Sequence, residues 1–126
     1  MRGQGGFTLL ELMLVVVIIG ILSGLVAVSV QGRSTKAKQA AASADVITYR
    51  NAIEAYALEH DDKYPKSLRE LVGGEIDYVM EVKPDPWKNE YVFEVPAKRG
   101  NHKYDIFSRG PDGIAGNEDD ISCWSD

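Results

Sequence analysis

The sequence predicts an α+β protein in which one long N-terminal helix precedes a small antiparallel sheet. Three observations carry this prediction. An uncharged apolar run near the N-terminus passes into an amphipathic segment that contains no proline before Pro65. Two short runs of strand-forming residues follow, and a turn sequence separates them. The chain has 126 residues, which suits one folded domain rather than two.

The apolar run extends from Leu12 to Gly32 without a charged residue. As a helix, these roughly 21 residues span about 31 Å, which matches the hydrocarbon thickness of a bilayer. We therefore expect residues 7–32 to form a transmembrane helix. The alternative is a cleaved secretory signal, but the apolar core of such a signal is shorter, at about 7 to 15 residues.

One carboxylate, that of Glu11, lies at the start of this apolar run. A charged group at the centre of a bilayer costs about 2.5–3.5 kcal/mol on insertion scales, and the cost is smaller near the interface. A positively charged partner would offset this cost. The alternative is an interfacial side chain that reaches water and has no partner.

The segment after Arg33 is amphipathic. Its apolar side chains recur at steps of three, four and three residues, at Val46, Tyr49, Ile53 and Tyr56. This spacing places them on one helical face. We expect a continuous helix from about Phe7 to about His60, with this face packed on a sheet.

The globular part, residues 33–126, includes the second half of this helix. A short apolar face followed by two glycines predicts a second, short helix at Leu68, Leu71 and Val72, ended by Gly73 and Gly74. Residues 91–95 and 104–108 are expected to be strands, and residues 98–101 the hairpin turn between them.

The C-terminal segment is acidic and rich in glycine. Four carboxylates lie within nine positions, at Asp112, Glu118, Asp119 and Asp120. Glycines let the chain curl so that carbonyl oxygens point inward, and hard oxygen ligands suit calcium. The spacing differs from that of an EF-hand. From the residues alone, a calcium site and a solvated acidic turn both remain open.

Composition excludes several function classes. The net charge of −5, without clustered basic residues, argues against a nucleic-acid partner. No nucleophile motif, phosphate-binding loop or zinc spacing is present, so we expect no enzyme. Cys123 is the only cysteine, which excludes an intramolecular disulfide. We expect it to be a packed or partly exposed thiol, and an intermolecular disulfide in an oxidising compartment remains the alternative. His60 and His102 are expected at the surface.

The stretch from Gly6 to Glu11, GFTLLE, resembles the leader motif of type IV pilins and type II secretion pseudopilins. The resemblance implies that a prepilin peptidase cleaves after Gly6, which removes residues 1–6, and then methylates the new N-terminus at Phe7. It also implies that Glu11 pairs with the terminal amine of Phe7 in a neighbouring copy during assembly.

Further segments resemble the major pseudopilins of type II secretion: Tyr64-Pro65, Asp85-Pro86-Trp87 and Asp105-Ile106-Phe107-Ser108. The implied fold is type IV pilin-like, with a long helix on a small sheet and a C-terminal calcium loop. The GPDG sequence, the later Asp-Asp-Ile and the tryptophan resemble that loop. By position, calcium would be held by side chains of Asp112, Asp119 and Asp120 and by backbone carbonyls of Arg109, Ile114 and Asn117.

The resemblance implies a homopolymer that works with minor pseudopilins and an inner-membrane assembly platform. The chain would cross the bacterial inner membrane once, with its C-terminal domain in the periplasm. The alternative within filament proteins is a type IV pilin of a surface pilus, for adhesion, motility or DNA uptake. Typical type IV pilins carry a C-terminal disulfide loop, which one cysteine does not allow. A membrane-anchored enzyme or binding domain with the same leader is a third hypothesis.

Overall fold

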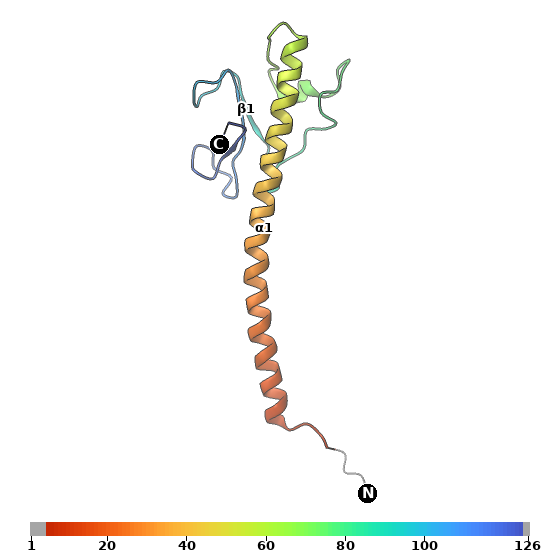
Figure 1. The fold of residues 1–126 in the computed structure, drawn as a ribbon, viewed down its shortest axis with the longest axis vertical. Coiled ribbons are helices and arrows are strands. Elements are labelled where there is room, and N and C mark those ends of the chain that lie inside the picture. The colour runs from red at the N-terminus through yellow and green to blue at the C-terminus, as the bar shows by residue number, and fades with distance from the viewer. Residues whose placement is uncertain (1–4, 125–126) are drawn as a thin grey trace. The chain divides into compact units, whose positions relative to one another are not determined.

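The structure, a computed structural model, describes the backbone of residues 5–124 and the side chains of residues 5–25 and 32–124. The chain divides into two compact units, with the boundary between Thr35 and Lys36. The helix α1 (Leu9–Glu59) has 51 residues and contributes to both units (Figure 1). Its ends lie within about two residues of the predicted ends, which is the usual uncertainty of a helix boundary.

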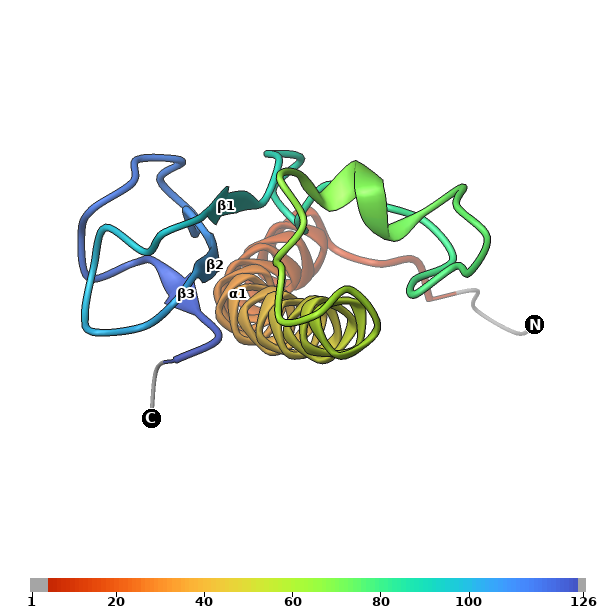
Figure 2. The same ribbon diagram turned by 90° about the horizontal axis from the view of Figure 1, so that it is seen from above.

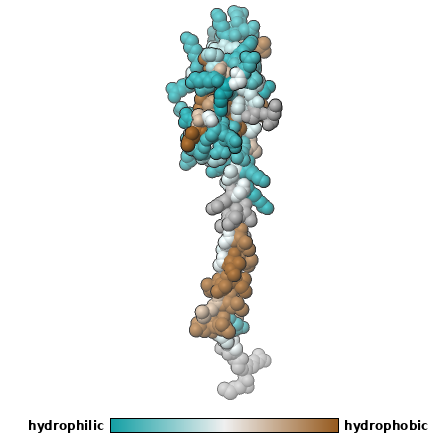
Figure 3. Space-filling model, turned by 90° about the vertical axis from the view of Figure 1, so that its left-hand side faces the viewer, coloured by the Kyte–Doolittle hydropathy of each residue, from teal (hydrophilic) through white to brown (hydrophobic). Residues whose placement is uncertain are grey.

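In the first unit, α1 presents exposed apolar side chains, which form the brown stretch of the helix in Figure 3. From Phe7 to Leu25, every large apolar side chain is about half exposed or more. Over the residues whose side chains are described, no helix is both long and apolar enough to cross a membrane. The predicted span, residues 7–32, also includes residues 26–31, which lie outside that set.

The second unit, which we call the head, contains a sheet of three antiparallel strands in the order β1-β2-β3. The strands are β1 (Val92–Glu94), β2 (Asp105–Ser108) and β3 (Ile121–Ser122). Phe93 pairs with Ile106, and Phe107 pairs with Ser122. The prediction of β1 and β2 is confirmed, and β3, which is only two residues long, was not predicted.

The predicted second helix is a single 3₁₀ turn, η1 (Leu68–Leu71). Figure 2 shows the sheet and the C-terminal segment on one side of α1, while η1 and the chain that follows it lie toward the other. Leu68 and Leu71 are buried, as their spacing predicted, whereas Val72 is only half-buried. The carbonyl oxygen of Leu71 accepts hydrogen bonds from the amides of Tyr78 and Val79, which ties the next loop to η1.

The predicted apolar face of α1 forms the centre of the head. Val46, Tyr49 and Ile53 are buried, and Tyr56 is half-buried at the edge of the cluster. Other elements cover this face with a set of mostly apolar side chains: Leu68, Leu71, Tyr91, Tyr104, Ile106 and Cys123. The match between helical spacing and burial explains why the sheet packs where it does.

Two tyrosines fix the sheet to α1 through carboxylates. The Tyr91 hydroxyl donates to Asp45 at 2.8 Å, and the Tyr104 hydroxyl donates to Glu54 at 2.7 Å. Burial raises the pKa of both tyrosines, and the hydrogen bond from each hydroxyl to its carboxylate raises the pKa further. Both hydroxyls are therefore protonated donors at neutral pH.

The C-terminus of the described chain returns to the core. Cys123 is 6% exposed, and its amide donates to the carbonyl oxygen of Ile106 at 3.1 Å. The Arg50 guanidinium donates to the Cys123 carbonyl oxygen at 3.2 Å, which links this residue to α1. Cys123 is therefore packed rather than partly exposed.

Residues 109–120, which we call the C-terminal loop, connect β2 to β3 through tight turns at three glycines. Gly110, Gly113 and Gly116 all have positive φ, at 72°, 70° and 92°. At Gly110 the space is also filled, because a Cβ would lie 2.1 Å from the carbonyl oxygen of Asp119. At Gly116, no atom lies within 4 Å of such a Cβ. The two ends of the loop therefore touch at Gly110.

These two glycines allow a matched test. We expect Gly110→Ala to lower the free energy of unfolding by about 3 kcal/mol, because backbone strain and a backbone clash both act there. Gly116→Ala introduces only the strain and is expected to cost about 1 kcal/mol. Urea denaturation followed by tryptophan fluorescence measures both values. Equal costs for the two variants would contradict the close contact between the loop ends.

Candidate functional site

The predicted assembly residue, Glu11, takes part in the N-terminal cap of α1. The Glu11 amide donates to the Thr8 hydroxyl at 3.2 Å. In return, the Thr8 amide donates to Glu11 Oε2 at 3.1 Å, and the Thr8 hydroxyl lies 3.3 Å from the same oxygen. This reciprocal pattern is a capping box, which satisfies amides that the first helical turn leaves without partners. A carboxylate in the first turn also interacts favourably with the helix dipole.

The predicted cleavage site precedes this cap. Gly6 and Phe7 belong to neither a helix nor a strand, and Phe7 is 81% exposed. No atom lies within 4 Å of a Cβ built on Gly6. The peptide bond after Gly6 is therefore open to solvent.

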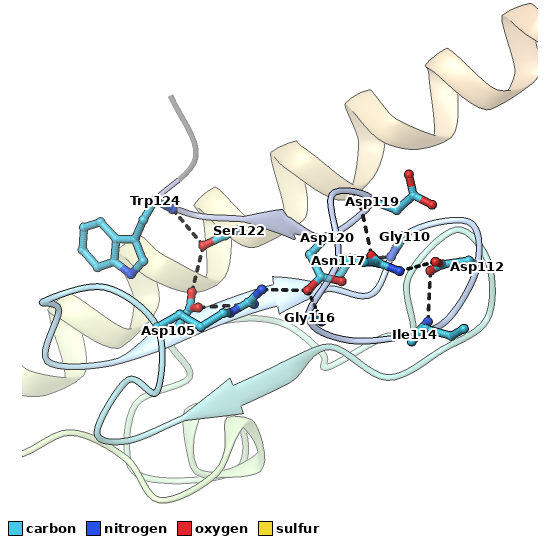
Figure 4. Close-up of polar contacts among 12 residues, drawn as sticks. Asp105, Gly110, Asp112, Ile114, Gly116, Asn117, Asp119, Asp120, Ser122 and Trp124 are labelled. Carbon is cyan, nitrogen blue, oxygen red and sulfur yellow. Dashed lines mark hydrogen bonds and ion pairs between the residues drawn. The ribbon is translucent and has the colours of Figure 1, made fainter.

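The predicted metal residues lie in the C-terminal loop, where the side chains of Asp112, Asn117 and Asp120 already form hydrogen bonds (Figure 4). Asp112 Oδ1 accepts the Ile114 amide at 3.0 Å, and Asp112 Oδ2 accepts the side-chain amide of Asn117. Asn117 Oδ1 accepts the Asp119 amide at 3.1 Å. The contacts to the Ile114 and Asp119 amides are Asx-type turns, which an aspartate or asparagine forms with the backbone two residues further along.

Asp120 is the most deeply buried of the three predicted carboxylates. Its side chain is 3% exposed. Oδ2 accepts the Gly116 amide at 2.7 Å and lies 2.7 Å from Nη1 of Arg99. Oδ1 is buried and has no hydrogen-bond partner among the described residues. A buried carboxylate oxygen without a donor is unfavourable, so this atom is a natural ligand for a cation.

The donor chemistry fits calcium better than the arrangement of the side chains does. All the predicted ligands offer oxygen atoms, and Asp120 Oδ1 is an open acceptor. However, the Asp119 carboxylate points away from the loop in Figure 4. Of the predicted backbone ligands, Asn117 uses its carbonyl oxygen to accept the Asp120 amide at 3.3 Å. Among the described residues, no three histidine, cysteine or acidic side chains converge in a way that would hold a metal.

The other two predicted backbone ligands have different environments. The Ile114 side chain is 63% exposed, and its amide is held by Asp112. Arg109 is half-buried directly after β2. Both lie in the same loop as the carboxylates.

Sequence reasoning missed two residues beside this loop. Arg99 lies in the loop between β1 and β2, and Asp105 is buried in β2, with Arg99 Nη2 3.5 Å from Asp105 Oδ2. The signal for Asp105 was present, because an aspartate inside an apolar strand requires a partner if it is buried. The signal for Arg99 was absent, since its partners are distant in the sequence.

The chain matches two known families over adjacent segments. Residues 29–124 match the family described as type II secretion system (T2SS), protein G. Residues 1–27 match the prokaryotic N-terminal methylation motif. The second match includes Gly6, Phe7 and Glu11.

Relatives with the name type II secretion system core protein G align over nearly the whole chain. The protein of Aeromonas hydrophila is 40% identical over 98% of this chain and 94% of its own length. That of Escherichia coli K12 is 38% identical over 96% of this chain and 91% of its own length.

A solved structure has a similar fold. It is the crystal structure of the major pseudopilin from the type 2 secretion system of enterohaemorrhagic Escherichia coli, with a TM-score of 0.63 and 29% identity. The match covers 74% of this chain and 87% of that chain. The predicted pilin-like α+β fold is therefore confirmed, and the matches favour the secretion family over the type IV pilins. The chain belongs to the type II secretion system protein G family.

Proposed function

We propose that this chain is a structural subunit of the type II secretion pseudopilus. Copies polymerise into a periplasmic filament, and growth of the filament drives folded proteins across the outer membrane. The observation that carries this proposal is the alignment of nearly the whole chain with proteins named type II secretion system core protein G. We propose no catalytic role and no nucleic-acid partner.

Deletion of the gene tests this function. We expect secreted proteins to accumulate in the periplasm, because the filament that moves them is missing, and we expect surface pili to remain intact. Enzyme assays of the culture supernatant and electron microscopy of the cell surface measure the two effects. Normal secretion with loss of pili would instead favour the pilin hypothesis.

The N-terminus supports a maturation step by a prepilin peptidase. The enzyme would cut after Gly6 and methylate the amine of Phe7, at a site that is exposed and precedes the helix. Residues 7–32 would then anchor the mature chain in the inner membrane, with residues 33–126 in the periplasm. Minor pseudopilins and the inner-membrane assembly platform would be the partners during growth.

Glu11 is the proposed assembly residue. It also caps α1 through Thr8, so a test of assembly must separate the effect of pairing from that of capping. The positively charged terminal amine at Phe7 of an adjacent copy would neutralise the Glu11 carboxylate and offset the cost of a charge in the membrane. The same carboxylate accepts the Thr8 amide within its own chain. An alanine at this position removes both contacts, so it does not distinguish capping from pairing.

Glutamine makes this distinction. Glu11→Gln keeps an acceptor for the capping box but removes the charge. We expect both Glu11→Gln and Glu11→Ala to enter the membrane and to lose assembly by about tenfold or more, because neither can neutralise the Phe7 amine. Cross-linking between copies in membranes measures assembly. If Glu11→Gln assembles like the unchanged protein while Glu11→Ala does not, Glu11 acts as a cap and the pairing proposal is wrong.

We also propose that calcium stabilises the C-terminal loop. Asp112, Asp119 and Asp120 would supply side-chain oxygens, and Arg109, Ile114 and Asn117 would supply carbonyl oxygens. The support is the oxygen-only donor set and the unpartnered Asp120 Oδ1. A bound calcium ion would neutralise charge at the loop and hold the turns together, and no chemical step is assigned to it.

A calcium titration tests this proposal. At a hundredfold excess over its dissociation constant, a ligand specific for the folded state adds about 2.7 kcal/mol, which corresponds to roughly 10–20 °C in Tm for a head of this size. We expect this difference between calcium and EDTA in the unchanged protein. Asp112→Asn keeps the hydrogen bond to the Ile114 amide but removes a charged ligand. For this variant, the difference in Tm between calcium and EDTA should shrink by at least half.

Glu118→Gln is the matched control, because Glu118 lies in the same loop and has no proposed role in binding. Its response to calcium should equal that of the unchanged protein. If Asp112→Asn responds fully, Asp112 is not a ligand.

A further inference from the structure

Arg99 places one positive charge between two buried carboxylates. Its Nη1 lies 2.7 Å from Asp120 Oδ2, and its Nη2 lies 3.5 Å from Asp105 Oδ2. The carboxylate side chains are only 3–4% exposed, whereas that of Arg99 is 39% exposed. The guanidinium carbon also lies 3.8 Å from the ring centroid of Phe107, so the ring supports the cation from one side.

The three charged groups come from three separate segments of the head. Arg99 belongs to the loop between β1 and β2, Asp105 begins β2, and Asp120 directly precedes β3. Ser122, in β3, donates to the other oxygen of Asp105 at 2.8 Å. The guanidinium therefore connects the β1–β2 loop to the end of the C-terminal loop, beside a β3 strand of only two residues.

The charge balance around Arg99 is incomplete. A buried charge is tolerated when it is paired, and removal of its partner is strongly destabilising. Two carboxylates here share one guanidinium, and Asp120 Oδ1 has no partner among the described residues. Arg99 supplies the positive charge that contacts both carboxylates. Its Nη2 also has no hydrogen-bond partner among the described residues, and Asp120 Oδ1 is left as an acceptor for a second cation.

We infer that Arg99 is a positioning residue that docks the C-terminal loop onto the sheet by neutralising Asp120, and that it does so without a metal. Its guanidinium and a bound divalent cation act on the same carboxylate. Loss of Arg99 consequently makes the loop depend on the cation. Only this second part rests on the calcium proposal above.

The experiment compares Arg99→Met with the unchanged full chain in detergent, each in EDTA and in calcium. Methionine keeps an unbranched apolar stem over Phe107 but removes the charge. Hydrogen exchange of the amides in residues 109–122, followed by mass spectrometry, reports on the loop itself. In EDTA, we expect exchange in Arg99→Met to be about tenfold faster or more, because Asp120 is left buried without a counter-charge.

Calcium should then slow amide exchange in the loop of Arg99→Met, and by a larger factor than it slows exchange in the unchanged protein. Lys98→Met is the matched control: it removes a charge from the adjacent position, where the lysine side chain is 79% exposed and pairs with Glu94 at 3.4 Å. We expect Lys98→Met to leave exchange in the loop unchanged.

A double-mutant cycle shows whether the effect acts through Asp120. Asp120→Asn removes the buried charge. Arg99→Met should therefore speed amide exchange in the loop by a much smaller factor in an Asp120→Asn background than in the unchanged protein. The inference would be overturned if Arg99→Met sped exchange by the same factor in both backgrounds, or if exchange of Arg99→Met in EDTA equalled that of the unchanged protein. If calcium alters neither protein while Arg99→Met still opens the loop in EDTA, the calcium proposal fails and the role of Arg99 stands.

Discussion

The head depends on the burial of one apolar face of α1. Val46 and Ile53 are fully buried, and three strands of two to four residues pack around this face. A sheet of such short strands has little stability by itself, because each strand forms few hydrogen bonds and buries little surface. The helix therefore provides the surface on which the sheet forms. The carboxylates of Asp45 and Glu54 then fix its position through two tyrosine hydroxyls.

Most of this arrangement followed from local patterns in the sequence. The absence of proline before Pro65 predicted the length of α1, and side-chain spacing predicted its buried face. Strand-forming residues on either side of a turn predicted β1 and β2. In the candidate site, the positions of the C-terminal carboxylates and glycines identified the loop. These features were predictable because each depends on residues that are close together in the chain.

The features that were missed depend on long-range contacts or on competing roles. β3 is too short for a periodic pattern, and it exists because the chain returns to β2 after the loop. Arg99 lies 21 positions before Asp120, so only the fold reveals their contact. For Glu11, the T-x-x-E pattern with Thr8 was visible in the sequence. Because an apolar run follows, the sequence favours the interpretation of Glu11 as a charge at the membrane and not as part of a helix cap.

The position of Cys123 has a consequence for its chemistry. Burial raises the pKa of this thiol, so little of it is the reactive thiolate at neutral pH. Its backbone is also held by Ile106 and Arg50. We therefore expect oxidation or cross-linking of Cys123 to be slow while residues 121–124 stay packed on the sheet. The rate at which Cys123 reacts with a thiol reagent would thus report how often the head opens near its C-terminus, without an engineered cysteine.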